Sequence, residues 1–199
     1  CQEEMSAADL IGKDAYELID KAAELSRPGA DGLIYLPYLM GERSPHLDSD
    51  CRGVFFGLSA RHTKRDMLRA IMEGVAYSLR DCLEIIKDMG VAPESVRASG
   101  GGGKSGLWRQ IQADIYGTPI DTVNSGEGPA LGVALLAGVG AGLYRNVPEA
   151  CDAAVEVVTR QDYDAGNHRI YDEYYKLYDN IYNSLKRDFK TLAKIKTAL

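Results

Sequence analysis

Four consecutive glycines, Gly100, Gly101, Gly102 and Gly103, precede Lys104 and Ser105 between a predicted strand and a predicted helix. Glycine has no Cβ, so a ligand can approach the backbone of such a turn closely. The helix that follows offers unpaired N–H groups and the positive end of its dipole, and Ser105 is expected to be its N-cap. The segment therefore predicts a ligand-binding turn, with a plain connecting turn as the alternative.

Two known phosphate motifs overlap this turn. Gly103 to Ser105 looks like the end of a P-loop, but that motif needs a glycine where Ala98 stands, so the match fails. Gly101, Gly103 and Gly106 fit the dinucleotide-binding pattern, and Asp121 follows about twenty residues later. A dinucleotide-dependent oxidoreductase domain therefore remains an alternative, although no N-terminal strand–helix–strand unit precedes the turn.

A second polar group lies in the loop from Gly41 to Asp50 and comprises Glu42, Arg43, His46 and Asp48. One interpretation is a hydrogen-bonded surface loop. The other is a polar cluster that faces a cleft, with the Arg43 guanidinium near a phosphate or a second domain. The residue types alone do not separate these two interpretations.

The elements that position these residues follow from hydrophobic spacing and turn residues. The central part alternates, with strands at 95–99 and 119–123 and helices at 105–116 and 129–143, which indicates an α/β fold with parallel strands. We also predict helices at 15–25, from 63 to about 89, after Pro148, and at 167–193. Shorter strand candidates lie at 33–36, 53–57 and 155–159.

The helix from Thr63 has a capping-box-like start with Asp66 and an apolar stripe formed by Met67, Ile71, Val75, Leu79, Leu83 and Ile86. Arg69 and Glu73 occupy its predicted polar side, where an intrahelical ion pair is favoured over a role in a cleft. The terminal helix is rich in tyrosine. We expect these rings to cover a core edge while their hydroxyl groups stay in water.

Composition excludes several classes of protein. The chain has 199 residues, a 45% hydrophobic share and a 26% charged share, and these values are ordinary for one globular domain. The net charge of −6 argues against duplex nucleic acid as partner. No apolar run is long enough to cross a membrane. The four cysteines and three histidines lack metal-ligand spacing, so we predict reduced thiols, no metal site and a cytoplasmic location.

Four segments in fixed order carry a resemblance to a known family. Gly53–Leu58 with Asp66–Glu73 resembles the second signature of the FGGY carbohydrate kinases, and Pro37–Asp48 looks like the GERxPH loop of the xylulokinases within that family. Gly100–Asp114 resembles the family's adenosine motif, and Gly128–Gly132 the helix start that closes the nucleotide side. The resemblance covers about Leu33 to Leu143 and matches the two ends only in character.

This resemblance implies a ribonuclease-H-like, actin-like ATPase domain over residues 1–199, the C-terminal half of a two-domain sugar kinase. It implies ATP and Mg²⁺ as cofactors and D-xylulose, converted to D-xylulose 5-phosphate, as the substrate. Gly101, Gly102 and Ser105 would contact adenine and ribose, while Lys104 would point to solvent. Another FGGY kinase, such as a gluconokinase or ribulokinase, and a non-catalytic actin-like module are the alternatives.

The resemblance also defines what these residues do not supply. In the family the catalytic aspartate, the phosphate hairpin and most sugar contacts lie upstream of the matched region, so we expect no catalytic residue in this chain and no activity from it alone. A ribonuclease-H-like domain opens with three antiparallel strands that have no match here. We therefore expect an unpaired edge on the strand at 95–99, and either self-association or a bound N-terminal domain.

Overall fold

The computed structural model describes residues 2–124 and 128–197. In chain order the elements are α1 (Gln2–Ile11), α2 (Ala15–Glu24), the 3-10 turn η1 (Ala30–Gly32), β1 (Ile34–Leu36), β2 (Val54–Phe56), α3 (Lys64–Asp88), β3 (Val96–Ala98), the 3-10 turn η2 (Gly102–Lys104), α4 (Gly106–Tyr116), β4 (Ile120–Val123), α5 (Gly128–Gly140), α6 (Val147–Ala154), β5 (Val157–Gln161) and α7 (Ala165–Thr197). Every helix and strand that the sequence predicts is present; α1 was not predicted.

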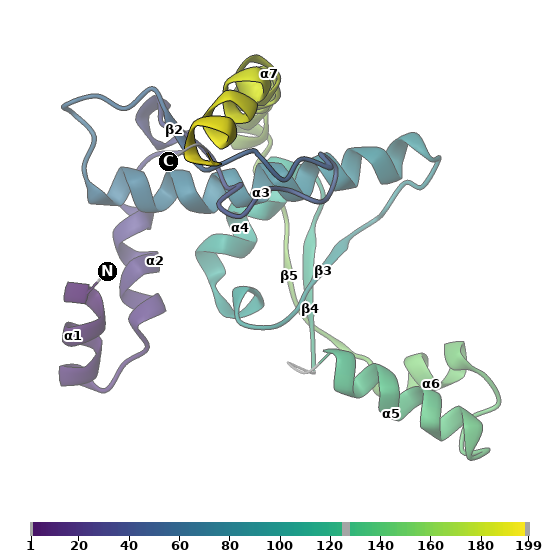
Figure 1. Cartoon of the computed structure of the whole chain (residues 1–199). Helices are drawn as coiled ribbons and strands as arrows, with labels where there is room; N and C mark the ends of the chain where they lie inside the picture. Colours follow the sequence, from purple (N-terminus) through teal and green to yellow (C-terminus); the bar gives the residue numbers. More distant parts are fainter. Residues whose placement is uncertain (1, 125–127, 198–199) are drawn as a thin grey trace.

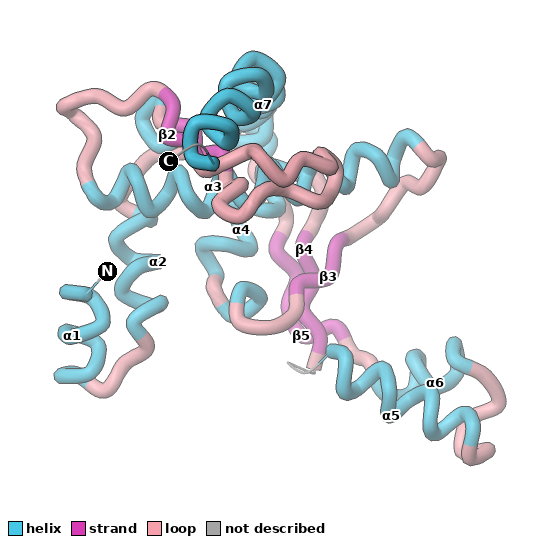
Figure 2. Tube along the Cα trace, in the orientation of Figure 1, coloured by secondary structure: helices cyan, strands magenta, loops and turns pink. Residues whose placement is uncertain are grey.

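The strands form two small sheets (Figure 2). β1 and β2 pair antiparallel, while β3 and β4 pair parallel with Val96 opposite Ile120. The predicted parallel pairing of the strands at 95–99 and 119–123 is thus confirmed, and β5, for which the sequence predicted no direction, joins β4 antiparallel. Two helices, α5 and α6, connect β4 to β5. The chain leaves the sheet along α5 and returns to it along α6, so β5 runs in the direction opposite to β4. Among the described strands β3 and β5 are the outer ones, so the predicted open edge of β3 is confirmed.

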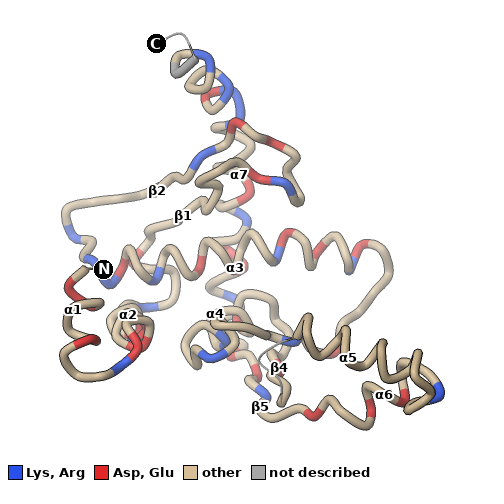
Figure 3. The backbone as a smooth tube through the Cα atoms, turned by 60° about the horizontal axis from the view of Figure 1, so that its bottom comes forward, with Lys and Arg blue, Asp and Glu red and all other residues tan. Residues whose placement is uncertain are grey.

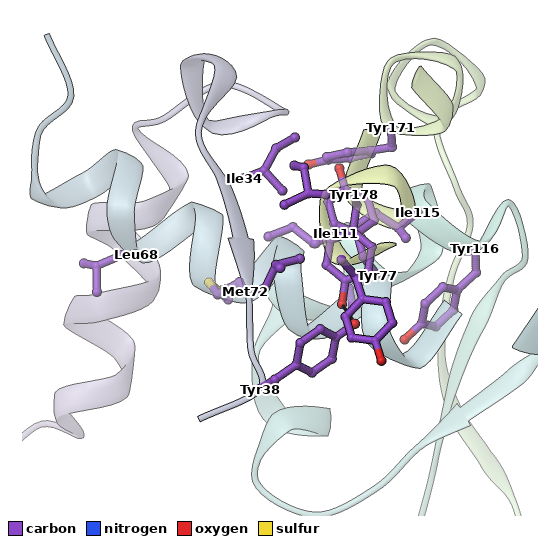
Figure 4. Packing of buried hydrophobic residues seen from close by; sticks show 14 of the residues in the cluster. Ile34, Tyr38, Leu68, Met72, Tyr77, Ile111, Ile115, Tyr116, Tyr171 and Tyr178 are labelled. Carbon is purple, nitrogen blue, oxygen red and sulfur yellow. Dashed lines mark hydrogen bonds between the residues drawn. The ribbon is translucent and has the colours of Figure 1, made fainter. Parts of the chain in front are cut away.

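The long helix α3 organises the core and begins with a capping box. The Asp66 carboxylate accepts hydrogen bonds from the Thr63 backbone and hydroxyl, both at 2.8 Å, and from the Ser26 hydroxyl at 2.6 Å. Burial alone would raise the pKa of Asp66, but these hydrogen bonds outweigh it and lower that pKa to about 2. β1, α2 and α4 pack on this helix. Figure 4 shows Met72 and Tyr77 from α3 among Ile111, Ile115 and the tyrosines of α7.

The apolar stripe predicted on α3 is only partly covered. Ile71, Leu79 and Ile86 remain 39%, 48% and 43% exposed. The most buried face lies beside it and carries Leu68, Met72, Ala76 and Tyr77 together with charged residues. Both the stripe and the edge of β3 are thus exposed among the described residues.

The prediction about the tyrosines of α7 is wrong in part. Tyr171, Tyr178 and Tyr182 are fully buried, and their hydroxyl groups have partners inside the protein. Tyr171 donates to the Glu73 carboxylate at 2.7 Å, and Tyr182 donates to Asp48 at 3.1 Å. Tyrosine spacing gave the helix face correctly but could not show that acidic partners from distant segments lie beneath it.

Arg69 and Glu73 form the predicted intrahelical ion pair, with 2.8 Å between Nε and Oε1, but inside the core. Their side chains are 7% and 2% exposed, so the prediction of a polar outer side for α3 is wrong. Further hydrogen bonds surround the pair: Arg69 donates to the Ser26 carbonyl and the Tyr171 hydroxyl, and the Gly29 N–H donates to Glu73. Multiple hydrogen bonds are what a buried ion pair requires.

The helices α5 and α6 form a projecting unit that we call the α5–α6 arm (Gly128–Ala154) (Figure 1). α5 is almost entirely apolar, yet only Leu135 and Gly138 of its residues are buried. No helix among the described residues is long and apolar enough to cross a membrane. Cys51, Cys82 and Cys151 are free thiols, and Cys1 lies outside the described residues.

Candidate nucleotide site

The glycine turn between β3 and α4 uses its glycines for different reasons. Gly100 has a φ of 71°, which side chains rarely adopt. A Cβ on Gly103 would lie 3.1 Å from the Ala98 carbonyl oxygen, and one on Gly102 would lie 3.4 Å from the Trp108 ring. The positive φ at Gly100 and the close backbone at Gly103 explain why glycine stands at these two positions, whereas a Cβ at Gly102 would make only an ordinary contact with Trp108.

Gly101 is different. Its φ of −59° suits any residue, and a Cβ built on it would meet nothing within 4 Å. Nothing in the described part of the chain therefore requires a glycine at this exposed position. Its backbone is therefore open to a ligand, and, unlike the equally open Gly132 and Gly140 of α5, Gly101 lines a cavity.

Ser105 caps α4 as predicted. Its hydroxyl accepts the Trp108 N–H at 3.0 Å, and this bond fixes the start of the helix directly after the turn. The Arg109 guanidinium donates to the Gly103 carbonyl at 2.6 Å and holds the turn against the same helix. Lys104 is exposed, in line with its predicted direction toward solvent.

A cavity of about 530 Å³ opens beside this turn. One wall consists of Gly101, Gly102, Lys104, Ser105 and Trp108, and the other comes from the start of α2. Its size is within the usual range for small-molecule sites. The indole N–H of Trp108 is buried without a hydrogen-bond partner among the described residues, so this wall contains one unpaired hydrogen-bond donor.

Asp121 does not support the dinucleotide alternative. It is 4% exposed in the middle of β4, and Arg160 on the neighbouring β5 lies 3.6 Å from its carboxylate. A dinucleotide domain needs this carboxylate free at the end of the strand for the ribose hydroxyls. Here the carboxylate is buried beside Arg160.

The acidic residues of the Gly41–Asp50 loop stabilise its conformation through hydrogen bonds. The Glu42 carboxylate accepts the backbone N–H groups of Arg43 and Ser44, at 2.6 and 3.0 Å. Asp48 is buried and accepts the Asp50 N–H at 2.9 Å as well as the Tyr182 hydroxyl. Both carboxylates thus bind backbone and core groups, while Arg43 is exposed beside a second, smaller hollow.

His46 connects the loop to the core. Its ring stacks on Tyr182 with 3.8 Å between centroids, and its Nε2 lies 3.8 Å from Oδ2 of Asp81 on α3. Burial lowers the pKa of His46 and raises the pKa of Asp81 to about 6. The loop and the glycine turn line separate cavities with no residue in common, so the two predicted groups do not form one site within the described residues.

Comparison with known proteins decides the family. The sequence model for the C-terminal domain of the FGGY family of carbohydrate kinases matches residues 1–141. The chain belongs to this family. A xylulose kinase of Staphylococcus epidermidis is 40% identical over 174 residues, which cover 87% of this chain and 35% of the relative. A gluconokinase of Bacillus licheniformis is 33% identical over 201 residues, covering 98% of this chain and 38% of the relative.

Solved FGGY kinase structures are also similar. A ligand-bound xylulose kinase from Lactobacillus acidophilus superposes with a TM-score of 0.83 at 28% identity and covers 92% of this chain. A gluconate kinase from the same organism gives the same TM-score at 29% identity and covers 90% of this chain. This chain spans 37% and 36% of those structures, so it corresponds to about a third of an FGGY kinase.

Sequence reasoning missed the second wall of the cavity. Asp14, Tyr16, Glu17 and Asp20 line it from α2. An amphipathic helix almost ninety residues before the glycine turn carries no motif that links the two segments. The only sequence signal was Tyr16, a large aromatic residue on the polar side of that helix.

Proposed function

We propose that this chain is the adenine-nucleotide-binding part of an ATP-dependent sugar kinase that converts D-xylulose to D-xylulose 5-phosphate in the cytoplasm. In this proposal residues 1–199 belong to a ribonuclease-H-like domain, and an N-terminal sugar-binding domain completes the enzyme. The FGGY family supports a sugar kinase, and the xylulose kinases among the relatives support this sugar.

Gly101 is the observation that carries the proposal. It leaves open backbone at the wall of a cavity, and the capped start of α4 lies directly beside it. A flat base can lie against such a surface, and the Gly100–Ser105 turn would contact adenine and ribose. In this role Gly100 and Gly103 shape the turn, while Gly101, Gly102 and Ser105 face the nucleotide.

Catalysis in this proposal needs residues outside this chain. Phosphoryl transfer depends on positioning, on a base for the accepting hydroxyl and on Mg²⁺ at the phosphates. The described residues contain no group of three acidic, histidine or cysteine side chains close enough to hold a metal ion. In this proposal Mg²⁺ coordinates the nucleotide phosphates in the complete enzyme, and we expect the isolated chain to be inactive.

The polar residues of the Gly41–Asp50 loop have a supporting role in the proposal; these are Glu42, Arg43, His46 and Asp48. Glu42, His46 and Asp48 would hold the loop on α3 and α7, and exposed Arg43 would be the member that meets the second domain or a phosphate. Arg43→Ala in the complete enzyme should then lower turnover without changing the stability of this chain.

Gluconate is a second candidate sugar, because a gluconokinase aligns with 98% of this chain and a gluconate kinase structure superposes with a TM-score of 0.83. A coupled ADP-release assay on the complete enzyme with D-xylulose, D-ribulose and D-gluconate separates these candidates. We expect turnover with D-xylulose, and preferential turnover with D-gluconate would reassign the sugar. The same assay on the 199-residue chain should show no sugar-dependent turnover.

The nucleotide itself can be tested in the isolated chain. Trp108, the single tryptophan of the sequence, lines the cavity, so its fluorescence reports binding there. We expect ADP and ATP to change this signal and NAD⁺ not to compete. Competition by NAD⁺ at equal or higher affinity would favour the dinucleotide alternative instead.

A further inference from the structure

The cavity at the glycine turn has a second wall with a chemistry of its own. The start of α2 contributes Tyr16 and three carboxylate side chains, those of Asp14, Glu17 and Asp20. Figure 3 marks the acidic positions of this region in red. Among the described residues that line the cavity, Lys104 on the glycine side is the only cation.

The position of Tyr16 is fixed by the local backbone. Asp14 is the N-cap of α2, and its carboxylate accepts the Tyr16 N–H at 3.0 Å. Tyr16 therefore stands in the first turn of a capped helix, yet its side chain is 73% exposed. A large ring held at a cavity wall but left in water is available for stacking, and stacking on an aromatic ring accepts any base.

The carboxylates restrict how a nucleotide can enter. Negative side chains repel phosphate groups, and they accept hydrogen bonds from hydroxyl and amino groups. A nucleotide in this cavity must therefore direct its nucleoside part toward α2 and its phosphates away from it. This orientation places the base next to Tyr16 and the ribose hydroxyls within the acidic wall.

We propose that Tyr16 stacks on the base of the bound nucleotide, and that Asp20 with Glu17 accepts hydrogen bonds from the ribose hydroxyls. This inference rests on the proposed nucleotide site and adds the residues that determine its selectivity. The ligand class is a nucleoside 5′-di- or triphosphate with free ribose hydroxyls. A phosphate on the 2′ or 3′ oxygen would meet the acidic wall and be rejected.

Substitution of Tyr16 tests the stacking. Tyr16→Ala should weaken ADP binding to the 199-residue chain about tenfold, measured by calorimetry and Trp108 fluorescence, while Tyr16→Phe keeps the ring and stays within about twofold. Leu25→Ala is the matched control, because Leu25 is similarly exposed at the end of α2 but does not line the cavity. Circular dichroism verifies that all variants are folded.

Asp20→Asn tests the acidic wall. It should strengthen binding of adenosine 3′,5′-bisphosphate relative to ADP by several-fold, because one repulsive charge is removed. If the parent binds ADP and Tyr16→Ala binds it equally well, the stacking role of Tyr16 is wrong while the proposed site stands. If the parent shows no ADP binding at all, the proposed site fails and this inference fails with it.

Discussion

The core formed by α3 and α7 buries polar groups, whereas the α5–α6 arm exposes apolar side chains. In the core, charged and hydroxyl groups are buried, and many have several partners from the same chain: Glu73 accepts from Arg69, Tyr171 and Gly29. In the arm, apolar side chains stand in water, with Val133 and Leu136 68% and 60% exposed. The core therefore places polar groups where hydrogen bonds compensate their burial, whereas the arm leaves apolar surface exposed among the described residues.

The largest expected effect comes from opening the buried ion pair. Arg69→Ala leaves the Glu73 carboxylate buried without its cation, and this should lower the free energy of unfolding by about 3–5 kcal/mol. Arg145→Ala breaks the arm's exposed Arg145–Glu149 pair and should leave stability unchanged within the precision of urea denaturation. Equal losses in the two variants would remove the contrast between core and arm.

A pH-dependent effect should follow from Asp81. Because burial raises its folded pKa to about 6, the parent loses stability as the pH rises from about 4 through 6. Asp81→Asn keeps an acceptor for Tyr175 and has no charge, so at pH 7.5 it should be more stable than the parent by about 1–3 kcal/mol. The gain should vanish near pH 4.

Urea denaturation of both proteins at pH 4.5 and 7.5 measures this difference. Asp88→Asn, at the exposed end of the same helix, is the control and should follow the parent at both pH values. A gain for Asp81→Asn that is equal at the two pH values would contradict the account, because it would not come from ionisation.

The arm's apolar surface and the open edge of β3 should make the isolated chain self-associate. Leu136→Arg places a charge on the exposed face of α5 and should shift the chain toward monomer without loss of helix content. Leu47→Arg, at a 91% exposed position in the Gly41–Asp50 loop, is the matched control. Light scattering over a range of concentrations measures the shift. A parent that stays monomeric at high concentration would show that this surface needs no partner.

The smallest effect concerns Gly132, which lies inside α5 with no atom within 4 Å of a Cβ built on it. Alanine there should stabilise the isolated chain by about 0.5–1 kcal/mol, because glycine is unfavourable inside a helix. Thermal unfolding detects such a gain. A loss of stability would mean that α5 is packed more closely than the structure shows.

Much of the fold could be predicted because its signals are local. Thr63 with Asp66, Ser105 and Gly117 mark helix ends through their own hydrogen bonds and backbone angles. The direction of β5 and the burial of Arg69 with Glu73 depend on segments far apart in the sequence. The acidic partners of the α7 tyrosines lie 94 to 134 positions away in the sequence, and such a pairing leaves no periodic pattern.

The same distinction holds for the candidate site. The glycine turn is contiguous, so its residues could be named from the sequence, and the structure then separates Gly101 from glycines that the fold requires. The wall from α2 could not be found, because only folding brings Tyr16 and Asp20 to this turn. The Glu42–Asp48 group is contiguous as well, yet its main partners, Tyr182 and Asp81, come from distant helices.

Calorimetry with ADP and Gly101→Val tests whether the glycine turn binds the nucleotide. The site is expected to bind weakly, since only base and ribose find partners in this chain, and valine at Gly101 fills the open space without strain in the turn. Gly140→Val, at an equally open glycine in the arm, is the matched control. The parent and Gly140→Val should bind ADP alike, whereas Gly101→Val should not bind it. Equal ADP affinity for Gly101→Val and the parent would contradict the proposed nucleotide site.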